Sequence, residues 1–410
     1  MKRQLIIVFT AMLILAGMVF AEPIGPAFFV GECKTDLGGR GTVAMAPNGN
    51  FVITWSSIGA DGNGWGVYAR RYDASGTALS DKFLVNTFAE GNQWASRIAM
   101  DGAGNFVITW ASEEQNGSGG GIYAQRYNAS GIPLGNEIQV KTHNTNLYRS
   151  VSIAMNNKGN FVIVWSSTGK SQSYEWNIFA RCYDASGKPK GSEFQVNPRV
   201  GNSHSDPLIG IDESGNFVIV WTCYLADNTK SIFLQCYDTS DIPQKNMFQV
   251  NSDRKNSPDS PFVGMNSTGK FVIAWMSRDN VWNIYARRYD ASGTPLGEEF
   301  RVNTTAEYAQ TYPSVSMDDL GNYIIAWSED DWSSRHYSMH AQQYDASGTR
   351  RGPEFQVNTH AQYSNPSVAM NNSGNYVIAW MGKMNDTYGV CAQRFSFDTA
   401  TPETENTPME

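Results

Sequence analysis

Residues 104–110 read GNFVITW, and close copies of this string recur along almost the whole chain. The copies end in seven tryptophans: Trp55, Trp110, Trp165, Trp221, Trp275, Trp327 and Trp380. These tryptophans are 52–56 residues apart, so the chain contains seven copies of one unit. A fixed period of this length is typical of repeat architectures, in which each unit packs on its neighbours.

Each unit contains four short segments with the composition of β-strands. In the second copy they are residues 98–100, 106–110, 122–127 and 137–141. Glycine-containing turns separate the first pair and the last pair, and the second segment is apolar on both faces, as expected of a strand between two packed layers. Four antiparallel strands repeated seven times predict an all-β fold, a seven-bladed β-propeller.

The fourth strand indicates how the ring closes. Its central valine lies 25 residues before the next anchor tryptophan in five copies and 23 before it in the sixth, whereas the last copy ends at residues 389–395 without a fourth strand. At the other end of the chain, Val30 lies 25 residues before Trp55. We therefore predict that residues 27–32 pair with 389–395 and complete the last blade, which removes two exposed sheet edges.

The strings G-x-F-V-V-x-W, Y-A-Q-R-Y-D-x-x-G and E-F-x-V-N-T, taken together, resemble a repeat found in secreted and surface proteins of bacteria. The resemblance covers residues 27–395 and implies a propeller-like fold without catalytic residues. Single copies depart from it. Thr239-Ser240-Asp241 replaces A-S-G, and Ser338-Met339-His340 replaces the usual start of the third strand.

The N-terminal segment has the layout of a secretory signal peptide. Lys2 and Arg3 precede an apolar run over residues 5–19, and Val19 and Ala21 are small residues at the −3 and −1 positions of a cleavage site. The run is short for an uncleaved membrane anchor, which is the alternative. We predict a signal peptide at 1–21, a propeller at 22–395 and a disordered acidic tail at 396–410. The mature protein would be secreted, periplasmic or at the cell surface, with no transmembrane segment.

Charge argues against one class of partner. The chain has 31 basic and 39 acidic residues, and without Lys2 and Arg3 the balance is 29 against 39, a net charge of about −10. Nucleic-acid binding needs a dense basic surface, because neutralising phosphates supplies most of the affinity. Nucleic acid is therefore not expected as a partner.

One face of the propeller is predicted to carry the binding site. The turns between strands one and two and between strands three and four are nearly constant among copies, with sequences such as NSGN and YDASG. The loops between strands two and three, and the loops that cross to the next blade, vary in length and content and share the opposite face. Variation confined to one face of a repeat array usually marks the face that binds.

Extra aromatic residues fall on this variable face. Five tryptophans lie outside the anchor set, all in or beside the variable loops: Trp65, Trp94, Trp176, Trp282 and Trp332. They are candidates for stacking on sugar rings or anchoring a protein partner. The alternative is that they cap the ends of the cores between blades.

A second candidate set lies where the crossing loops enter the inner strands, at the mouth of the central channel. It comprises Arg40, Arg149, Asp206, Asp259, Tyr312 and Asn365. Such a mixture suits a polar ligand or a cation, although every propeller has a hydrated channel mouth. The expected partner is a glycan or a cell-surface protein.

Enzymatic motifs are weak. The five histidines show no metal-ligand spacing, and no nucleophile elbow, phosphate loop or dinucleotide fingerprint is present, so no metal, cofactor or catalytic residue is assigned. The recurrent D-A-S-G resembles the turn motif of sialidase-like propellers, but it is also ordinary hairpin chemistry. The enzymatic alternative is a glycoside hydrolase or sialidase-like enzyme that uses two carboxylates at the channel mouth, with Asp206 and Asp259 as candidates.

The five cysteines are an odd number. Cys33 and Cys391 both fall on the closing blade, where a disulfide would lock the ring, and two reduced thiols are the alternative.

Overall fold

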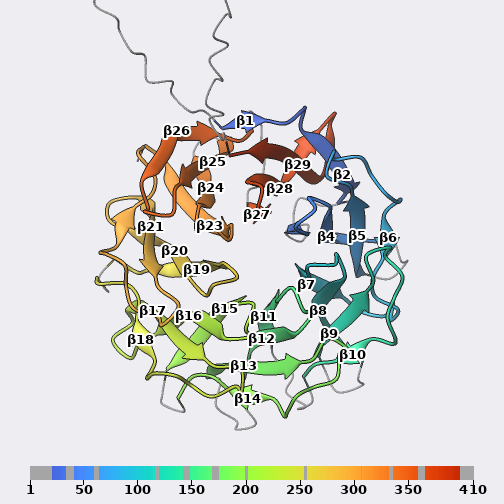
Figure 1. The fold of residues 1–410 in the computed structure, drawn as a ribbon, viewed down its shortest axis with the longest axis horizontal. Coiled ribbons are helices and arrows are strands. Elements are labelled where there is room, and N and C mark those ends of the chain that lie inside the picture. Colours follow the sequence, from blue (N-terminus) through green and yellow to red (C-terminus); the bar gives the residue numbers. More distant parts are fainter. Residues whose placement is uncertain are drawn as a thin grey trace, which may run out of the picture.

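The computed structural model describes residues 21–33, 41–59, 64–113, 115, 120–141, 148–168, 175–198, 202–253, 256–305, 307–331, 336–358 and 365–397. Over these residues it forms a ring of seven antiparallel sheets around a central axis (Figure 1). The predicted seven-bladed β-propeller is thus confirmed. No helix in this part of the chain is long and apolar enough to cross a membrane.

Each blade runs from an inner strand beside the axis to an outer strand at the rim, and six blades follow the order of the sequence (Figure 1). The inner strands are β3 (Thr42–Met45), β7 (Gln93–Met100), β11 (Tyr148–Met155), β15 (Ser203–Ile211), β19 (Asp259–Met265), β23 (Ala309–Met317) and β27 (Ser367–Met370). The second strands are β4 (Phe51–Ile58), β8 (Phe106–Ser112), β12 (Phe161–Thr168), β16 (Phe217–Tyr224), β20 (Phe271–Arg278), β24 (Tyr323–Asp331) and β28 (Asn375–Met384).

The third strands are β5 (Trp65–Tyr72), β9 (Gly121–Tyr127), β13 (Trp176–Tyr183), β17 (Lys230–Tyr237), β21 (Trp282–Tyr289), β25 (His336–Tyr344) and β29 (Thr387–Ser396). The outer strands of blades 1 to 6 are β6 (Phe83–Leu84), β10 (Ile138–Gln139), β14 (Phe194–Gln195), β18 (Phe248–Gln249), β22 (Phe300–Arg301) and β26 (Arg350–Gln356).

The seventh blade is completed by the N-terminal strand β2 (Phe28–Glu32), which pairs antiparallel with β29 as predicted. Figure 1 shows this blue segment against the red C-terminal strand. Gly31 passes so close to Trp55 that an added Cβ would lie 2.3 Å from the indole, so the closing strand needs glycine there. A further short strand, β1 (Glu22–Pro23), pairs with Phe395 and Ser396 at the outer edge and was not predicted.

The hydrophobic core is divided into seven clusters, one between each pair of neighbouring blades. On β4, Phe51, Ile53 and Trp55 pack toward the last blade, whereas Val52 packs toward the second. This alternation explains why the anchor strand is apolar on both faces. The seven anchor tryptophans are at most 3% exposed, so each fixes the contact of its blade with the preceding one.

The recurrent E-F-x-V-N string joins blades through polar contacts. The asparagine accepts a hydrogen bond from the backbone of the third strand, as Asn86 Oδ1 does from Val67 N at 2.8 Å. The glutamate reaches the preceding blade, where Glu137 accepts from the hydroxyl of Thr87 at 2.9 Å. Glu299 and Glu354 make the same kind of contact with Ser252 and Thr304. The string is therefore repeated because each blade must hold its neighbour.

Two kinds of boundary differ from expectation. The inner strands of blades 2 to 6 begin several residues earlier than predicted and include the last residues of the expected crossing loops. The final strand continues to Ser396, and Phe397 is buried in the core, two residues beyond the expected end of the domain. Residues 1–20 and 398–410, which hold most of the predicted signal peptide and tail, lie outside the described residues.

Cys33 and Cys391 are free thiols rather than a disulfide. The backbone of Cys33 bonds Tyr388, three positions along β29 from Cys391. Because side chains alternate along a strand, the two thiols belong to opposite faces of the blade. Cys33 packs in the core toward the first blade and Cys391 in the core toward the sixth.

Candidate functional site

The candidate site is a cavity of about 480 Å³ at the mouth of the central channel, on the variable face. All seven inner strands contribute to its wall. Its volume falls within the range of about 300–1,000 Å³ that is usual for small-molecule sites. The rim is polar and the deeper wall is apolar, with Val43, Ile153 and Val263 among the residues that line it.

A β-bulge in the inner strands shapes the rim. In β15 the pairing with β16 shifts between Ser205 and Leu208, and β7, β19 and β23 shift at the equivalent place. In each of these four strands, the first residue inside the bulge has a left-handed backbone although it is not glycine. These residues are Ala95 (φ 54°), Asp206 (φ 52°), Ser260 (φ 49°) and Tyr312 (φ 50°). Such conformations cost on the order of 1–3 kcal/mol each and cluster at functional sites.

The bulges re-aim side chains toward the cavity. Asp206, Ser260 and Tyr312 all line it, as does Asn365 at the equivalent position of blade 7. In four blades this residue is followed by a proline that also lines the cavity: Pro207, Pro261, Pro313 and Pro366. Three members of the predicted channel-mouth set, Asp206, Tyr312 and Asn365, are thus brought together with a fourth member, Asp259, from the neighbouring position.

The strongest electrostatic contact at the rim lies between blades 4 and 5. The Asp259 carboxylate forms an ion pair with Lys230 and accepts a hydrogen bond from its own neighbour, Ser260 N, at 2.8 Å. The Lys230 ammonium also lies over the ring of Tyr224, 4.9 Å from its centroid. Burial alone would lower the pKa of Lys230, but the hydrogen bond and charge of Asp259 raise it above its ordinary value. Lys230 therefore stays protonated and holds Asp259 in place.

Four of the five predicted tryptophans lie in the described part of the chain, and none of these four lines the cavity. Trp65, Trp176 and Trp282 are the first residues of third strands, outside the ring of inner strands, and are partly buried. Trp282 packs against the core between blades 5 and 6, as the capping alternative expected. Trp94 lies on an inner strand and is 37% exposed, but it does not line the cavity.

Three predicted residues cannot be compared in this way. Arg40 and Trp332 lie outside the described residues. Arg149 is placed only by its backbone, within β11.

Three residues of the site were not predicted, namely Arg97, Tyr224 and Lys230, whereas Ser150 occupies the same repeat position as Asp206. Arg97, Tyr224 and Ser150 line the cavity, and Lys230 anchors Asp259. Tyr224 and Lys230 face each other across the two–three hairpin of blade 4.

The opposite face is built from contacts within the protein. In the D-A-S-G turn, Asp73 Oδ1 accepts from Ser75 N, Ser75 Oγ and Thr77 N, and these hydrogen bonds, that of the Ser75 hydroxyl foremost, lower the pKa of Asp73. The guanidinium of Arg71 donates to the carbonyls of Ser130 and Ala129 in the turn of the next blade. The prediction that D-A-S-G is structural is consistent with this geometry.

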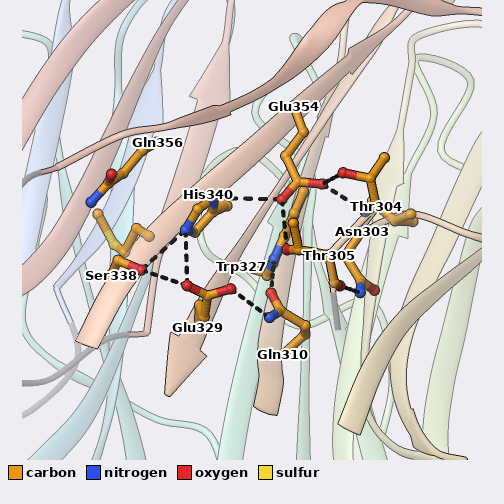
Figure 2. Close-up of polar contacts among 12 residues, drawn as sticks. Asn303, Thr304, Thr305, Gln310, Trp327, Glu329, Ser338, His340, Glu354 and Gln356 are labelled. Carbon is orange, nitrogen blue, oxygen red and sulfur yellow. Dashed lines mark hydrogen bonds and ion pairs between the residues drawn. The ribbon is translucent and has the colours of Figure 1, made fainter. Parts of the chain in front are cut away.

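A second polar cluster lies in blade 6 (Figure 2). His340 replaces the tyrosine or phenylalanine that stacks on the anchor tryptophan in other blades, and it stacks on Trp327. Its Nε2 lies 3.5 Å from Glu329 Oε1, and its Nδ1 lies 3.5 Å from Glu354 Oε1. The hydrogen bond from His340 lowers the pKa of Glu329 to about 2.

Ser338, His340 and Glu354 follow the order of a hydrolase triad, with Ser338 Oγ 3.0 Å from His340 Nε2. However, Ser338 is 2% exposed and also bonds Glu329 at 3.3 Å. Glu354 in turn accepts from Thr304 of the preceding blade at 2.7 Å, and Gln310 bridges Glu329 to the Trp327 indole (Figure 2). The cluster is a buried polar seam between blades 5 and 6. Across the described residues, no group of three or more His, Cys, Asp or Glu side chains is arranged to hold a metal ion.

No protein-family model matches the chain, and a comparison with curated protein sequences finds no match either. Solved structures share the fold. A polysaccharide lyase, an ulvan lyase, has a TM-score of 0.56 at 10% identity, covering 91% of this chain and 96% of the lyase. An α-L-arabinofuranosidase of Fusarium graminearum has a TM-score of 0.52 at 12% identity, covering 74% of this chain and 93% of the enzyme.

A third likeness concerns ring closure. The propeller domain of the Trilobed protease from Pyrococcus furiosus has a TM-score of 0.52 at 9% identity, covering 94% of this chain and 100% of that domain. That domain is described as having an open velcro topology, whereas in this chain β2 completes the last blade. At these identities the likenesses concern the fold alone. Any argument about function has to rest on the site.

Proposed function

We propose that the protein is an exported binding module that recognises a carbohydrate in the cavity at the channel mouth. The observation that carries the proposal is the cavity itself, because three blades accept a strained backbone at Asp206, Ser260 and Tyr312, whose side chains line it. Among the described residues, such non-glycine strain recurs in several blades at this rim, whereas in the turns of the other face it occurs at Asp241 alone (φ 63°). This difference supports selection for a ligand rather than for folding.

The chemistry of the wall suits a saccharide. Sugars offer hydroxyl groups at their edges and apolar C–H faces, and protein sites match these with polar side chains and aromatic rings. The rim supplies Asp206, Ser260 and Asn365 as hydrogen-bonding groups, and Tyr224 and Tyr312 as rings. Tyr224 is 36% exposed, so its ring is accessible from the mouth. The shared fold with an ulvan lyase and an arabinofuranosidase supports the same ligand class.

Binding is favoured over hydrolysis by the state of Asp259. Asp206 and Asp259 line one cavity from adjacent blades, as the enzymatic alternative requires. Yet the Asp259 carboxylate is already engaged by the Lys230 ammonium, by Ser260 N and by the Thr222 hydroxyl, so the protein holds it in a structural contact between blades. We therefore propose a non-enzymatic function for this cavity.

A glycan array with the mature protein tests the proposal directly. We expect binding to a restricted set of glycans, and at least a tenfold loss of affinity for Tyr312→Ala and for Asp206→Ala. Leu320→Ala, in an exposed turn of the opposite face, is the matched control and should bind normally. Retained binding in both rim variants would place the ligand elsewhere on the molecule. Release of sugar by the native protein, lost in Asp259→Asn, would instead favour the hydrolase.

Export is part of the proposal and has its own test. N-terminal sequencing of the protein recovered outside the cytoplasm should begin at Glu22. A protein that retains Met1 would contradict cleavage after Ala21.

A further inference from the structure

The wall of the cavity encloses it on every side. Each of the seven blades contributes at least one residue, in the ring order Thr42, Arg97, Ser150, Asp206, Asp259, Tyr312 and Asn365. Figure 1 shows the inner strands arranged around the axis without a break. The site is therefore a well that opens at the variable face, in contrast to a groove that is open at two ends.

The floor of the well is an apolar ring. Six inner strands place a valine or isoleucine into the lining at the same depth, each 6–9% exposed: Val43, Ile98, Ile153, Ile209, Val263 and Val368. The polar groups lie above this ring, at the rim. A ligand that enters thus meets hydrogen-bonding groups first and an apolar surface at the end.

Below the ring the channel becomes smaller. The space below, which is lined by residues of the inner strands of blades 2 to 6, has a volume of about 220 Å³, against 480 Å³ above. Here neighbouring strands come so close that an added Cβ on Gly210 would lie 2.9 Å from Met265 Cβ. One on Gly264 would lie 2.8 Å from Val315 Cγ1. The small residues at this level let the strands close in, so the passage narrows.

A well and a groove select different parts of a polymer. The middle of a linear chain can lie along a groove, because both of its ends can leave. In a channel that all seven blades enclose, the middle of a chain could enter from the mouth only as a hairpin, or after one end had been threaded through the smaller space below. Only a chain end or a free short saccharide fits without a hairpin or threading.

On this basis, which rests on the proposed function, we infer that the site recognises the end of a glycan chain, inserted end-on. The terminal sugar sets its less polar side against the valine and isoleucine ring, and its hydroxyls and those of the next sugar meet the rim. Tyr224, on the blade 4 side, provides a ring at the level where the second sugar leaves the mouth.

The test compares saccharides of different length. Linear oligosaccharides of two to six residues from cellulose, xylan, mannan and arabinan, and the parent polymers, are titrated by calorimetry. End-on binding predicts an affinity that stops rising after two or three residues. It also predicts that limited cleavage of a bound polymer, which creates ends, raises the binding capacity per gram.

Plug variants locate the bound end. Ser150→Phe and Val263→Phe place a large side chain into the well from blades 3 and 5, and both should lower affinity at least tenfold for every length. Leu320→Phe, in a turn of the opposite face that is 74% exposed, is the matched control. Two plugs in different blades, each checked for an unchanged unfolding temperature, prevent a misfolded variant from being read as a blocked site.

The outcomes are distinguishable. Affinity that rises through six residues and is unaffected by either folded plug variant would overturn end-on recognition while leaving carbohydrate binding in place. Absence of binding by every saccharide at millimolar concentration would overturn both proposals.

Discussion

The two faces of the propeller use polar groups in different ways. On the constant face, hydrogen bonds run from blade to blade: Asn157 N donates to Glu213, Glu213 N to Ser267, and Ser267 N to Asp319. On the variable face, the inner strands carry bulges with left-handed residues, and side chains point into a cavity. On the constant face polar groups join blades, whereas on the variable face Asp206 and Asn365 line the cavity, and Asp259 both lines it and joins blades 4 and 5. Recognition is thus assigned to one face, which a repeat array permits because each blade contributes to both.

The largest effect on stability should come from removing the N-terminal strands that close the ring. Deleting residues 22–32 removes β1 and β2, exposes the edge of β29 and leaves the Trp55 core open. We expect loss of cooperative unfolding and aggregation, because an open edge strand is a template for pairing with another chain. Thermal unfolding and size-exclusion chromatography measure this. An unchanged unfolding temperature would show that the ring does not depend on this closure.

The next largest effect is a loss of stability at acidic pH, caused by His204. His204 is 2% exposed and accepts a hydrogen bond from the Trp221 indole at 3.0 Å, and burial lowers its pKa to about 4 from an ordinary 6.5. Between pH 6.5 and 4 the unfolded state binds a proton at His204 that the folded state does not. The contribution of neutral His204 to the free energy of unfolding is therefore complete above pH 6.5 and is lost as the pH falls toward 4. We expect a loss of about 3 kcal/mol over that interval. Urea unfolding at a series of pH values would show it.

Blade 6 suggests the matched control for His204. There Gln310 occupies the equivalent position, and its Oε1 accepts a hydrogen bond from the Trp327 indole. His204→Gln should keep the indole contact and flatten the pH profile between 4 and 6.5. An equally steep profile in this variant would assign the acid sensitivity to groups other than His204.

A smaller effect is expected from the contacts of the constant face. Arg71→Met removes the two hydrogen bonds to the turn of the next blade, at 2.6 and 2.8 Å. Because these bonds are exposed to solvent, we expect a loss of about 1 kcal/mol in the free energy of unfolding. Ligand binding should be unchanged. A variant with native stability but weaker binding would break the proposed separation of the two faces.

The smallest effect on stability should come from the rim. Asp206→Asn keeps an acceptor for Ser205 Oγ and places a residue that tolerates left-handed backbone at φ 52°. We expect the free energy of unfolding to change by less than about 0.5 kcal/mol, with a measurable change in glycan affinity by calorimetry. A large loss of stability here would mean that the strained rim serves folding.

Much of this architecture could be read from the chain alone. The seven tryptophans and their spacing predicted the number of blades, and Val30, 25 residues before Trp55, predicted that the N-terminus completes the last blade. These features are readable because each blade repeats one hydrophobic pattern and one set of turns. The resemblance to a bacterial surface repeat stays a prediction.

The site was only half predictable. Position in the repeat placed Asp206, Asp259, Tyr312 and Asn365 at the mouth, and the cavity contains all four. The same reasoning placed Trp65, Trp176 and Trp282 on the same face, but they begin third strands away from the cavity. The repeat pattern does not show how far a loop residue lies from the propeller axis. That distance depends on which strand of the blade the residue belongs to and on where that strand begins.

The sequence by itself therefore determined the repeat, the ring and its closure, since these follow from local periodicity and from the need to bury one face of each blade on the next. Only the tertiary structure decided which side chains meet. The bulges that turn Asp206 and Tyr312 inward, and the pairing of Lys230 with Asp259 across two blades, depend on backbone register and on contacts between residues far apart in the repeat.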